Sequence, residues 1–463
     1  MRRIEFIKGI IGVGALPSIL KSTKNLDSQD INGLIQDQSI KSSGNLFGHT
    51  VDPIEKVRVG IIGLGNRGNT LVQMLQWLSE NNHCEIIALS DLKEKKVNNA
   101  ADIISKWQKT KPTTYFGPTD EWKKLANRDD LDLIVIATPW EYHAEMSIYG
   151  MEQGKHVASE VPIAYTLKDC WNIISTAERT KRHCIMLENC CYNEEELFVL
   201  NMAQEGVFGD LTHAEGAYLH DLRAHLLSET YYEDQWRIKH HVTTDANLYT
   251  THGLGPISMY MSINRGDNLA LLTSMSSREL NLSEAAKKEK SEYIKIACGD
   301  MNTTMIKTEK GKTIMLQFDV HTGRPYSRIN KLVGTKAVHD GYPSRLYIDK
   351  EELTFWGHQW LDDEEYSNYK TKYTHPLIQK IKPISQQFKQ GHGGMDFVMM
   401  YRLIRALNQG LPLDINVYDS VLWSAVTPLS ALSVASNSIP IQVPDFTNGK
   451  WEGEQELEIM QNI

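Results

Sequence analysis

Two hydrophobic patterns divide the chain near residue 190. Before that point, short apolar runs of the kind found in buried strands alternate with segments whose apolar residues recur at helical spacing. The runs predict strands over residues 57–63, 85–90, 132–137, 155–159 and 183–187. Helical spacing occurs between them, for example over residues 93–109, 143–152 and 167–180. This alternation predicts an α/β domain with a doubly wound parallel sheet.

Beyond residue 190 the candidate strands become longer and more loosely spaced. They lie over residues 211–218, 270–276, 293–299, 302–307, 312–319 and 328–333. The segments between them read as turns and charged loops, and we interpret the Glu/Lys run over 281–292 as a solvated face. We therefore expect a second, α+β domain with an open, largely antiparallel sheet. Late helical stretches over 394–409 and 417–436 are expected to pack back on the first domain.

The N-terminus has the layout of an export signal. Arg2, Arg3 and Lys8 flank a short apolar stretch over residues 9–20. We assign residues 1–30 to a signal of the twin-arginine or the general secretory type, which predicts a periplasmic protein, with an ordinary N-terminus as the alternative. The expected organisation continues with a polar linker over 31–54, a first domain over 55–190, a second domain over 191–440 and a tail over 441–463.

Charge and cysteine content exclude several kinds of partner. The formal net charge of -9 over 463 residues argues against a nucleic acid or an anionic membrane, and no apolar run is long enough to span a bilayer. The six cysteines include no Cys-x-x-Cys pair and no zinc spacing, so we expect buried free thiols. His220 and Asp221 could suggest metal ligands, but no second cluster supports them, and we predict no metal.

A Gly-x-Gly-x-x-Gly motif joins the first predicted strand to the first helix. Gly63 would permit the tight turn, Gly65 would let a pyrophosphate approach the backbone, and Gly68 would allow the helix to pack closely on the strand. Helix N-termini bind phosphate groups through free backbone N–H groups. The motif therefore predicts a dinucleotide site in a Rossmann domain, with a purely structural glycine turn as the alternative.

The second predicted strand ends at Asp91, about where a carboxylate would bind the ribose of a dinucleotide. A strand-end cap is the structural alternative. Because the negative charge of Asp91 disfavours a 2′-phosphate, NAD is expected as the cofactor. NADP stays open because three basic residues lie nearby, namely Arg67, Lys93 and Lys95.

The next strands end at the same edge of the sheet and resemble a known family. Trp140 follows one of them, where it could contact the cofactor or pack under the loop. The order of these pieces over residues 55–440 resembles the Gfo/Idh/MocA oxidoreductases. In that family a strand ends Glu-Lys-Pro, but here Val161 replaces the lysine. The family's Asp-x-x-x-His is also altered, since Leu248 stands four residues before His252. These departures argue against ordinary dehydrogenation with release of a ketone.

Four segments resemble a more specific group, glycoside hydrolase family 109, whose members are NAD-dependent α-N-acetylgalactosaminidases. The segments are Asn-Leu-Tyr-Thr-Thr-His-Gly-Leu-Gly-Pro over 247–256, Gln-Trp-Arg over 235–237, Gly-Arg-Pro-Tyr over 323–326 and Gly-His-Gly-Gly-Met-Asp over 391–396. The match includes both departures from the wider family. The resemblance implies that the substrate is a glycan with a terminal α-linked N-acetylgalactosamine.

The resemblance also implies roles for individual residues. The cofactor site would comprise Gly63, Gly65, Asn66, Arg67, Gly68, Asp91, Trp140, Glu141, Tyr142, His143, Glu160, Val161 and Asn189. Within it, Asn66 and Arg67 would contact the pyrophosphate. The sugar site would comprise Tyr218, Arg237, Tyr249, Thr250, Thr251, His252 and Tyr326.

Tyr249 and His252 are the expected acid/base pair, because they are three residues apart and could point to one side of a helical turn. Tyr326 or Tyr218 could share their role. Some of these residues have structural alternatives. Arg237 could belong to a solvated basic turn, and a lone histidine such as His252 is often structural. His392 lies in a glycine turn, and a site role for it is left open.

The mechanism that the resemblance implies is an elimination. Bound NAD takes hydride from C3 of the sugar, and the resulting ketone acidifies the proton on C2. A base removes that proton, the aglycone leaves C1, water adds at C1, and hydride returns to C3. NAD-dependent glycosidases are a known exception to the two-carboxylate mechanism.

Two other functions remain as alternatives. One is a sugar oxidoreductase that uses free NAD or NADP, against which Val161 argues. The other is a sugar-sensing protein without activity, against which Tyr249, His252 and Arg237 argue. The open sheet of the second domain also offers a face for a homodimer.

Overall fold

The computed structural model describes residues 9, 28–36, 44–350 and 355–454. Its first domain holds a six-stranded sheet in the order β3-β2-β1-β4-β5-β6, and every neighbouring pair is parallel. The strands are β1 (Val57–Ile62), β2 (Cys84–Asp91), β3 (Thr113–Phe116), β4 (Leu133–Ile136), β5 (His156–Ser159) and β6 (Cys184–Met186). All four residues of β4 are buried, as expected for a strand covered on both faces. The predicted doubly wound sheet is confirmed.

The helices of this domain lie on both faces of the sheet. They are α3 (Asn66–Met74), α4 (Gln76–Glu80), α5 (Glu94–Ile104), α6 (Glu121–Ala126), α7 (Trp140–Glu152) and α8 (Leu167–Thr180). The helix predicted over 93–109 ends at Ile104, and the edge strand β3 follows it unpredicted. None of the residues of β3 is buried, which explains why the strand has no clear hydrophobic pattern.

The second domain is built on an eight-stranded sheet in the order β13-β12-β11-β7-β10-β9-β8-β14. The pair β7–β10 is parallel and the other neighbouring pairs are antiparallel, which confirms the predicted sheet type. The strands are β7 (Leu211–Leu219), β8 (Leu269–Ser276), β9 (Asn302–Thr308), β10 (Thr313–Asp319), β11 (Lys331–Gly334), β12 (Ala337–Gly341), β13 (Ser344–Ile348) and β14 (Ile441–Gln442).

One strand predicted for this domain is absent, and one predicted charged loop contains a helix. Residues 293–299, which the structure describes, form no strand, because Ile294 points outward and the segment pairs with no neighbour in the sheet. The charged run over 281–292 begins with a helix, α13 (Asn281–Lys288). Leu282 and Ala286, four residues apart, bury one face of that helix, while its Lys and Glu residues remain in solvent.

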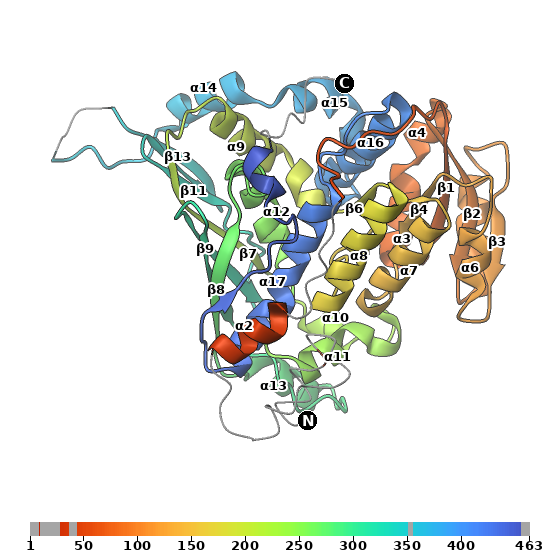
Figure 1. Cartoon of the computed structure of the whole chain (residues 1–463), viewed down its shortest axis with the longest axis horizontal. Helices are drawn as coiled ribbons and strands as arrows, with labels where there is room; N and C mark the ends of the chain where they lie inside the picture. The colour runs from red at the N-terminus through yellow and green to blue at the C-terminus, as the bar shows by residue number, and fades with distance from the viewer. Residues whose placement is uncertain (1–8, 10–27, 37–43, 351–354, 455–463) are drawn as a thin grey trace.

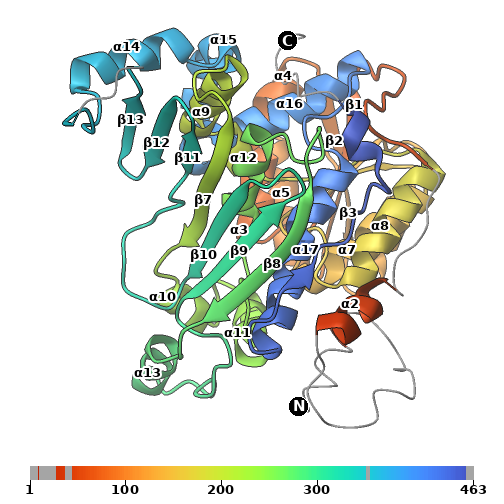
Figure 2. The same ribbon diagram turned by 60° about the vertical axis from the view of Figure 1, so that its left-hand side comes forward.

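Long helices join the two sheets. The helices of this part are α9 (Glu194–Gln204), α10 (Arg223–Leu227), α11 (Trp236–Thr243), α12 (Thr251–Tyr260), α14 (Asp363–Tyr373), α15 (Pro376–Ser385), α16 (Met395–Gln409) and α17 (Val417–Ala435). Helix α17 packs on both α8 and β8, and α16 packs on α3 and β1. Figures 1 and 2 show α17 lying between the two sheets. The C-terminal helices thus bridge the domains.

Helix α12 approaches β7 closely. A Cβ atom at Gly253 would lie 2.6 Å from the backbone N of Ala217, and one at Gly216 would lie 2.8 Å from the carbonyl O of Gly253. Side chains at either position would push the helix from the sheet. The close contact places the N-terminus of α12, which carries Thr251 and His252, beside the end of β7, which carries Tyr218.

The chain ends differ from the predicted organisation. Part of the expected linker belongs to a helix, α2 (Ser28–Gln36), in which Ile31 and Ile35 are buried, and residues 441–442 of the expected tail form β14. The predicted export signal lies almost entirely outside the described residues. In the described ranges, no helix is long and apolar enough to cross a membrane. All six cysteines lie in these ranges, and each is buried and free.

Candidate active site

The glycine turn between β1 and α3 has the shape of a pyrophosphate cradle. Gly63 has φ +90°, and a Cβ atom there would lie 2.6 Å from the carbonyl O of Ala137. A Cβ at Gly68 would lie 1.9 Å from the carbonyl O of Gly63. At Gly65, by contrast, Lys96 Nζ at 3.9 Å is the nearest described atom. Among the described residues no side chain caps the N-terminus of α3, so its first N–H groups can bind phosphate. The residues present fit a dinucleotide.

Asp91 holds this turn from the end of β2. Its Oδ2 accepts a hydrogen bond from the backbone N of Leu64 at 2.8 Å, and its Oδ1 accepts one from the backbone N of Lys93 at 2.9 Å. The capping role is therefore real. A carboxylate has further lone pairs, so Asp91 can also accept ribose hydroxyl groups. Asn66 in the same turn donates from Nδ2 to the carbonyl O of Tyr231 at 3.2 Å.

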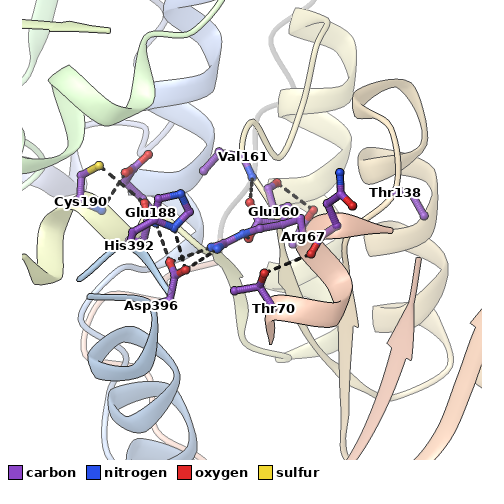
Figure 3. Close-up of polar contacts among 12 residues, drawn as sticks. Arg67, Thr70, Thr138, Glu160, Val161, Glu188, Cys190, His392 and Asp396 are labelled. Atoms are coloured by element: carbon purple, nitrogen blue, oxygen red, sulfur yellow. Dashed lines mark hydrogen bonds and ion pairs between the residues drawn. The ribbon is translucent and has the colours of Figure 1, made fainter. Parts of the chain in front are cut away.

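Arg67 is the centre of a buried ion-pair network (Figure 3). Its Nε donates to Glu160 Oε1 at 2.6 Å. Its Nη1 and Nη2 donate to the two carboxylate oxygens of Asp396 at 2.6 and 3.0 Å. Asn189 Nδ2 donates to Asp396 Oδ1 at 2.6 Å, and His392 Nδ1 lies 2.8 Å from Asp396 Oδ2. The guanidinium of Arg67 thus faces carboxylates, which differs from the expected contact with the pyrophosphate.

Asp396 was missed by the sequence reasoning as a site residue. It lies in the first turn of α16 and is fully buried. Burial alone would raise its pKa, but the charges and hydrogen bonds of Arg67 and His392 together more than offset this, so the pKa of Asp396 lies below its usual range. The available signal was its place in the Gly-His-Gly-Gly-Met-Asp motif, since an acid at a helix N-terminus is otherwise unremarkable.

The residues that open α7 point in different directions. Trp140 is buried, and its ring centroid lies 5.8 Å from that of Tyr249 and 4.9 Å from that of His240. Tyr142 is 46% exposed. His143 is buried, with Nδ1 2.7 Å from the carbonyl O of Pro162 and Nε2 2.7 Å from that of Thr138. Trp140 therefore faces the expected sugar site, whereas His143 ties the ends of β4 and β5 together.

Glu141 and Val161 complete the predicted cofactor residues. A carboxylate oxygen of Glu141 lies 3.5 Å from Nε2 of His240, which connects α7 to α11. Val161 is buried beside Glu160 at the end of β5 (Figure 3). Its apolar side chain cannot exchange a proton, so any acid or base must come from elsewhere in the site.

The structure brings four predicted sugar-site residues together. The ring centroids of Tyr218 and Tyr249 are 4.5 Å apart, and those of Tyr249 and His252 are 4.8 Å apart in a T-shaped arrangement. The guanidinium carbon of Arg237, on α11, lies 4.8 Å from the centroid of Tyr249. These residues come from β7, α11, the first turn of α12 and the segment just before it, which converge at one end of the second sheet. We call them the aromatic cluster.

Glu188, which the sequence reasoning missed, holds His252 of this cluster. Its Oε1 and Oε2 lie 2.7 and 2.9 Å from Nδ1 of His252, and Oε1 also accepts the backbone N of Cys190 at 3.1 Å. Burial alone would raise the pKa of Glu188, but the neighbouring His252 more than offsets this and lowers it. Because a carboxylate only accepts, Nδ1 of His252 carries a proton, and in the neutral ring the lone pair is therefore on Nε2. The available signal was an acid two residues after the end of β6.

Two hydrogen-bond donors of Arg237 have no partner among the described residues. Its Nη1 donates to the hydroxyl of Tyr232 at 2.7 Å, and its guanidinium lies over the rings of Trp140 and Tyr232. Its Nε and Nη2 are buried and have no hydrogen-bond partner within the described part of the chain. Buried donors without partners are costly, so these two atoms can bind an oxygen of a ligand. The alternative of a solvated basic turn is wrong, because Arg237 is buried.

The remaining sugar-site candidates lie around this cluster. Thr250 is buried and donates from Oγ1 to the carbonyl O of Trp423 at 2.8 Å, so its hydroxyl supports α17. Thr251 is also buried, in the first turn of α12. Tyr326 is 37% exposed, and its hydroxyl accepts from Arg328 Nη1 at 3.0 Å. Its ring centroid lies 6.1 Å from that of Tyr218, at the edge of the cluster.

Family models match both domains. The model described as "Oxidoreductase family, NAD-binding Rossmann fold" matches residues 57–188. The model described as "Glycosyl hydrolase 109, C-terminal domain" matches residues 192–453. The first domain is therefore an NAD-binding domain, and the boundary between the two models lies just after Glu188.

Relatives and solved structures agree with these matches. An alpha-N-acetylgalactosaminidase from Shewanella oneidensis is 44% identical over 425 residues, which are 90% of this chain and 91% of that protein. A glycosyl hydrolase family 109 protein from Solibacter usitatus is 43% identical over 433 residues, which are 91% of this chain and 95% of that protein.

A levoglucosan dehydrogenase in complex with NADH and levoglucosan is 16% identical, with a TM-score of 0.64 over 84% of this chain and 100% of that one. An NAD binding oxidoreductase from Klebsiella pneumoniae is 14% identical, with a TM-score of 0.63 over 85% of this chain and 100% of that one. These two structures share the fold. The family model over the second domain and the relatives over nine-tenths of the chain show that this protein belongs to glycosyl hydrolase family 109.

Proposed function

We propose that this protein hydrolyses terminal α-linked N-acetylgalactosamine by oxidation at C3, elimination of the aglycone, addition of water and reduction. The name of the Shewanella oneidensis relative, alpha-N-acetylgalactosaminidase, supports the substrate. The NAD-binding domain joined to a family 109 domain supports the redox route, which some glycosidases use in place of two carboxylates.

One arrangement carries this proposal: the pair of Glu188 and His252 beside Tyr249. When bound, NAD supplies the acceptor for the C3 hydride, and the ketone formed makes the C2 proton acidic. Nε2 of His252 is then the base for that proton. The buried carboxylate of Glu188 at 2.7 Å from Nδ1 holds the ring and stabilises the imidazolium that forms.

Tyr249 is suited to the acid role. Burial holds the pKa of its phenol well above the usual value, although Arg237 opposes this. The phenol therefore keeps its proton near neutral pH and can donate it to the departing glycosidic oxygen. Its ring lies 4.8 Å from that of His252, centroid to centroid, which places acid and base side by side. Tyr218 and Tyr326 flank this pair.

Arg237 is proposed to bind the sugar. Its unpartnered Nε and Nη2 present two donors in a fixed plane, and that plane lies against Tyr249 and Trp140. A hydroxyl or the acetamido oxygen of the sugar would satisfy both donors. The same contact would keep the reacting carbons close to Tyr249 and His252.

The experiment is hydrolysis of an aryl α-N-acetylgalactosaminide in D₂O without added NAD, followed by NMR of the released sugar. Deuterium at C2 is expected, because the C2 proton is removed and replaced in each turnover. Release of sugar without deuterium would contradict the elimination. No release, with NADH formed from free NAD and simple sugars, would favour the alternative sugar oxidoreductase.

Export and dimerisation are separate proposals. Export to the periplasm is supported by Arg2, Arg3 and the apolar stretch that follows Lys8. A homodimer across the outer face of the second sheet is supported by the exposed side chains of Met275 and Met305 on β8 and β9. Fractionation of cells that produce the full chain tests the first, and sedimentation of the purified protein tests the second.

A further inference from the structure

A buried group of metal-ligand side chains lies behind the aromatic cluster. His241 is in the last turn of α11, Cys298 is in the irregular segment before β9, and His321 follows β10. All three residues are buried, and one ligand atom from each lies within 4.8 Å of the other two. We propose that His241, Cys298 and His321 bind a zinc ion.

The distances suit such an ion. Zinc binds histidine nitrogen at about 2.0–2.1 Å and cysteine sulfur at about 2.3 Å in a tetrahedron, which places the ligand atoms about 3.3–3.8 Å apart. The three ligand atoms therefore need to move by no more than about an ångström to reach this geometry. A thiolate with two imidazoles is a ligand set that favours zinc over the hard cations magnesium and calcium. Water would complete the tetrahedron.

The hydrogen bonds of the two histidines are incomplete without a ligand. His241 Nδ1 lies 2.9 Å from His321 Nε2, and one proton shared between them satisfies both atoms. The outer nitrogens, Nε2 of His241 and Nδ1 of His321, are buried and have no hydrogen-bond partner among the described residues. Two unsatisfied nitrogens in one buried group are unusual, because buried polar atoms are nearly always paired. A metal ion bound to the two inner nitrogens would make each outer nitrogen an N–H donor, and that of His321 faces Asp300.

A carboxylate lies beside one of the proposed ligand histidines, as is common in metal sites. Asp300 Oδ1 lies 3.6 Å from Nδ1 of His321. Asp300 is itself held by the backbone N of Leu280 at 3.1 Å, and the backbone N of Asn281 at 3.2 Å. A ligand histidine commonly presents its second nitrogen to a carboxylate, which fixes the ring and strengthens the bond to the metal. Asp300 would serve His321 in this way.

The site would stabilise the sugar-binding helix. His241 and Arg237 are four residues apart on α11 and lie on the same side of that helix. The backbone N of Cys298 already donates to the carbonyl O of His241 at 3.0 Å. A metal that joins these segments to His321 would therefore fix the position of Arg237. This last step rests on the proposed role of Arg237 in binding sugar, whereas the metal site itself does not.

The sequence could not indicate this group. Its members stand 57 and 23 positions apart, at 241, 298 and 321, and match no zinc spacing. The expectation of no metal followed from that spacing. Only the packing of α11 against the end of β10 brings the three side chains together.

The test is metal analysis of the full chain. Protein produced with zinc and washed with a weak chelator is expected to keep about one zinc ion per chain, within the usual stoichiometry of such sites. Cobalt in place of zinc should give the visible bands of a tetrahedral ion and a thiolate-to-cobalt absorption band. Cys298→Ala should lose both the zinc and the bands. Cys184→Ala, which removes another buried thiol, should keep them.

Two results would overturn the proposal. The first is wild-type protein that retains neither zinc nor cobalt after reconstitution. The second is cobalt-loaded protein without a thiolate band, a result that holds even where Cys298→Ala fails to fold. If the site is real, metal removal should also raise the KM of the glycosidase more than it lowers kcat. That last readout fails together with the proposed function, whereas metal content and the cobalt spectrum do not.

Discussion

The two halves of the candidate active site differ in how completely the hydrogen-bond donors of their arginines are paired. Around Arg67, the charged donors and acceptors pair with one another, through Glu160 and Asp396. Around Arg237, two donors of a buried guanidinium have no partner among the described residues. The Arg67 side chain is 24% exposed and Arg237 is buried, so the more buried arginine is the one with unpaired donors.

This difference distinguishes Arg67, which is paired within the protein, from Arg237, which has donors available to a ligand. We call the surroundings of Arg67 the closed half of the site and those of Arg237 the receptive half. The Arg67 network joins the glycine turn of the first domain to α16, and so fixes the floor of the cofactor site. The ring-lined environment of Arg237 supplies no carboxylate and leaves its donors for a ligand. Under the proposed function, the same residue type would serve architecture in one half of the site and binding in the other.

The largest effect on activity is expected for substitution of His252, the proposed base. His252→Ala removes the proposed base, and kcat/KM for an aryl α-N-acetylgalactosaminide should fall by about 10²–10⁴-fold. Glu188→Gln should cause a smaller fall, since the base remains but loses its buried charge. The control is His213→Ala on β7, outside the cluster, which should leave the rate unchanged. Wild-type activity in His252→Ala would remove it from the mechanism.

Substitutions in the closed half should lower the stability of the fold. Asp396→Asn breaks a buried pair and leaves Arg67 with one carboxylate, so the free energy of unfolding should fall by about 3–5 kcal/mol. Urea unfolding measures it. The matched control is Asp102→Asn, whose pair with Lys111 is exposed and should contribute less than about 1 kcal/mol. Equal effects of the two substitutions would contradict a structural role for the network.

Arg237→Lys tests the receptive half more gently. Lysine keeps the charge but lacks the planar fork, so one charged hydrogen bond to the sugar is lost, which contributes about 1.5–3 kcal/mol. The KM should rise by about tenfold to a hundredfold, in line with that free energy, with a smaller change in kcat. Arg345→Lys on β13 is the control. An unchanged KM would show that the free donors of Arg237 do not bind substrate.

Sequence patterns predicted the local features of this comparison and missed the long-range ones. The glycine turn was predictable because strand, turn and helix are contiguous, and each glycine has a local steric reason. Tyr249 and His252 were predictable as a pair because they lie three residues apart in the chain, although α12 begins only at Thr251. Glu188 and Asp396 were missed, because their importance comes from His252 and Arg67, which lie far away in the chain.

The same reasoning explains the errors in the fold. Strand β3 and the hairpin β12–β13 lie at sheet edges, where partial exposure weakens the hydrophobic alternation. Residues 293–299 have a strand-like composition but no partner strand, and composition alone cannot supply one. Arg67 was expected to contact phosphate, and only the fold shows that it pairs with the carboxylates of Glu160 and Asp396.

The smallest expected effect is the pH dependence of the stability that Asp396 contributes. The pKa of Asp396 lies below its ordinary value of about 3.9, so its contribution to stability is complete above about pH 4 and is lost as the pH falls toward the folded-state pKa. Asp396→Asn has no such carboxylate. The stability gap between wild type and Asp396→Asn should therefore be constant from about pH 6 to pH 4 and narrow below it.

Urea unfolding at a series of pH values measures this gap, with Asp102→Asn as the reference. A gap that stays constant down to about pH 3 would mean that the pKa of Asp396 is the same in the folded and unfolded states. It would then follow that Arg67 stabilises the site by filling space rather than by charge. A gap that narrows assigns the stabilisation to the ion pair. Arg237 has no carboxylate partner within the described ranges, so the stability change caused by Arg237→Lys should not vary with pH in this range.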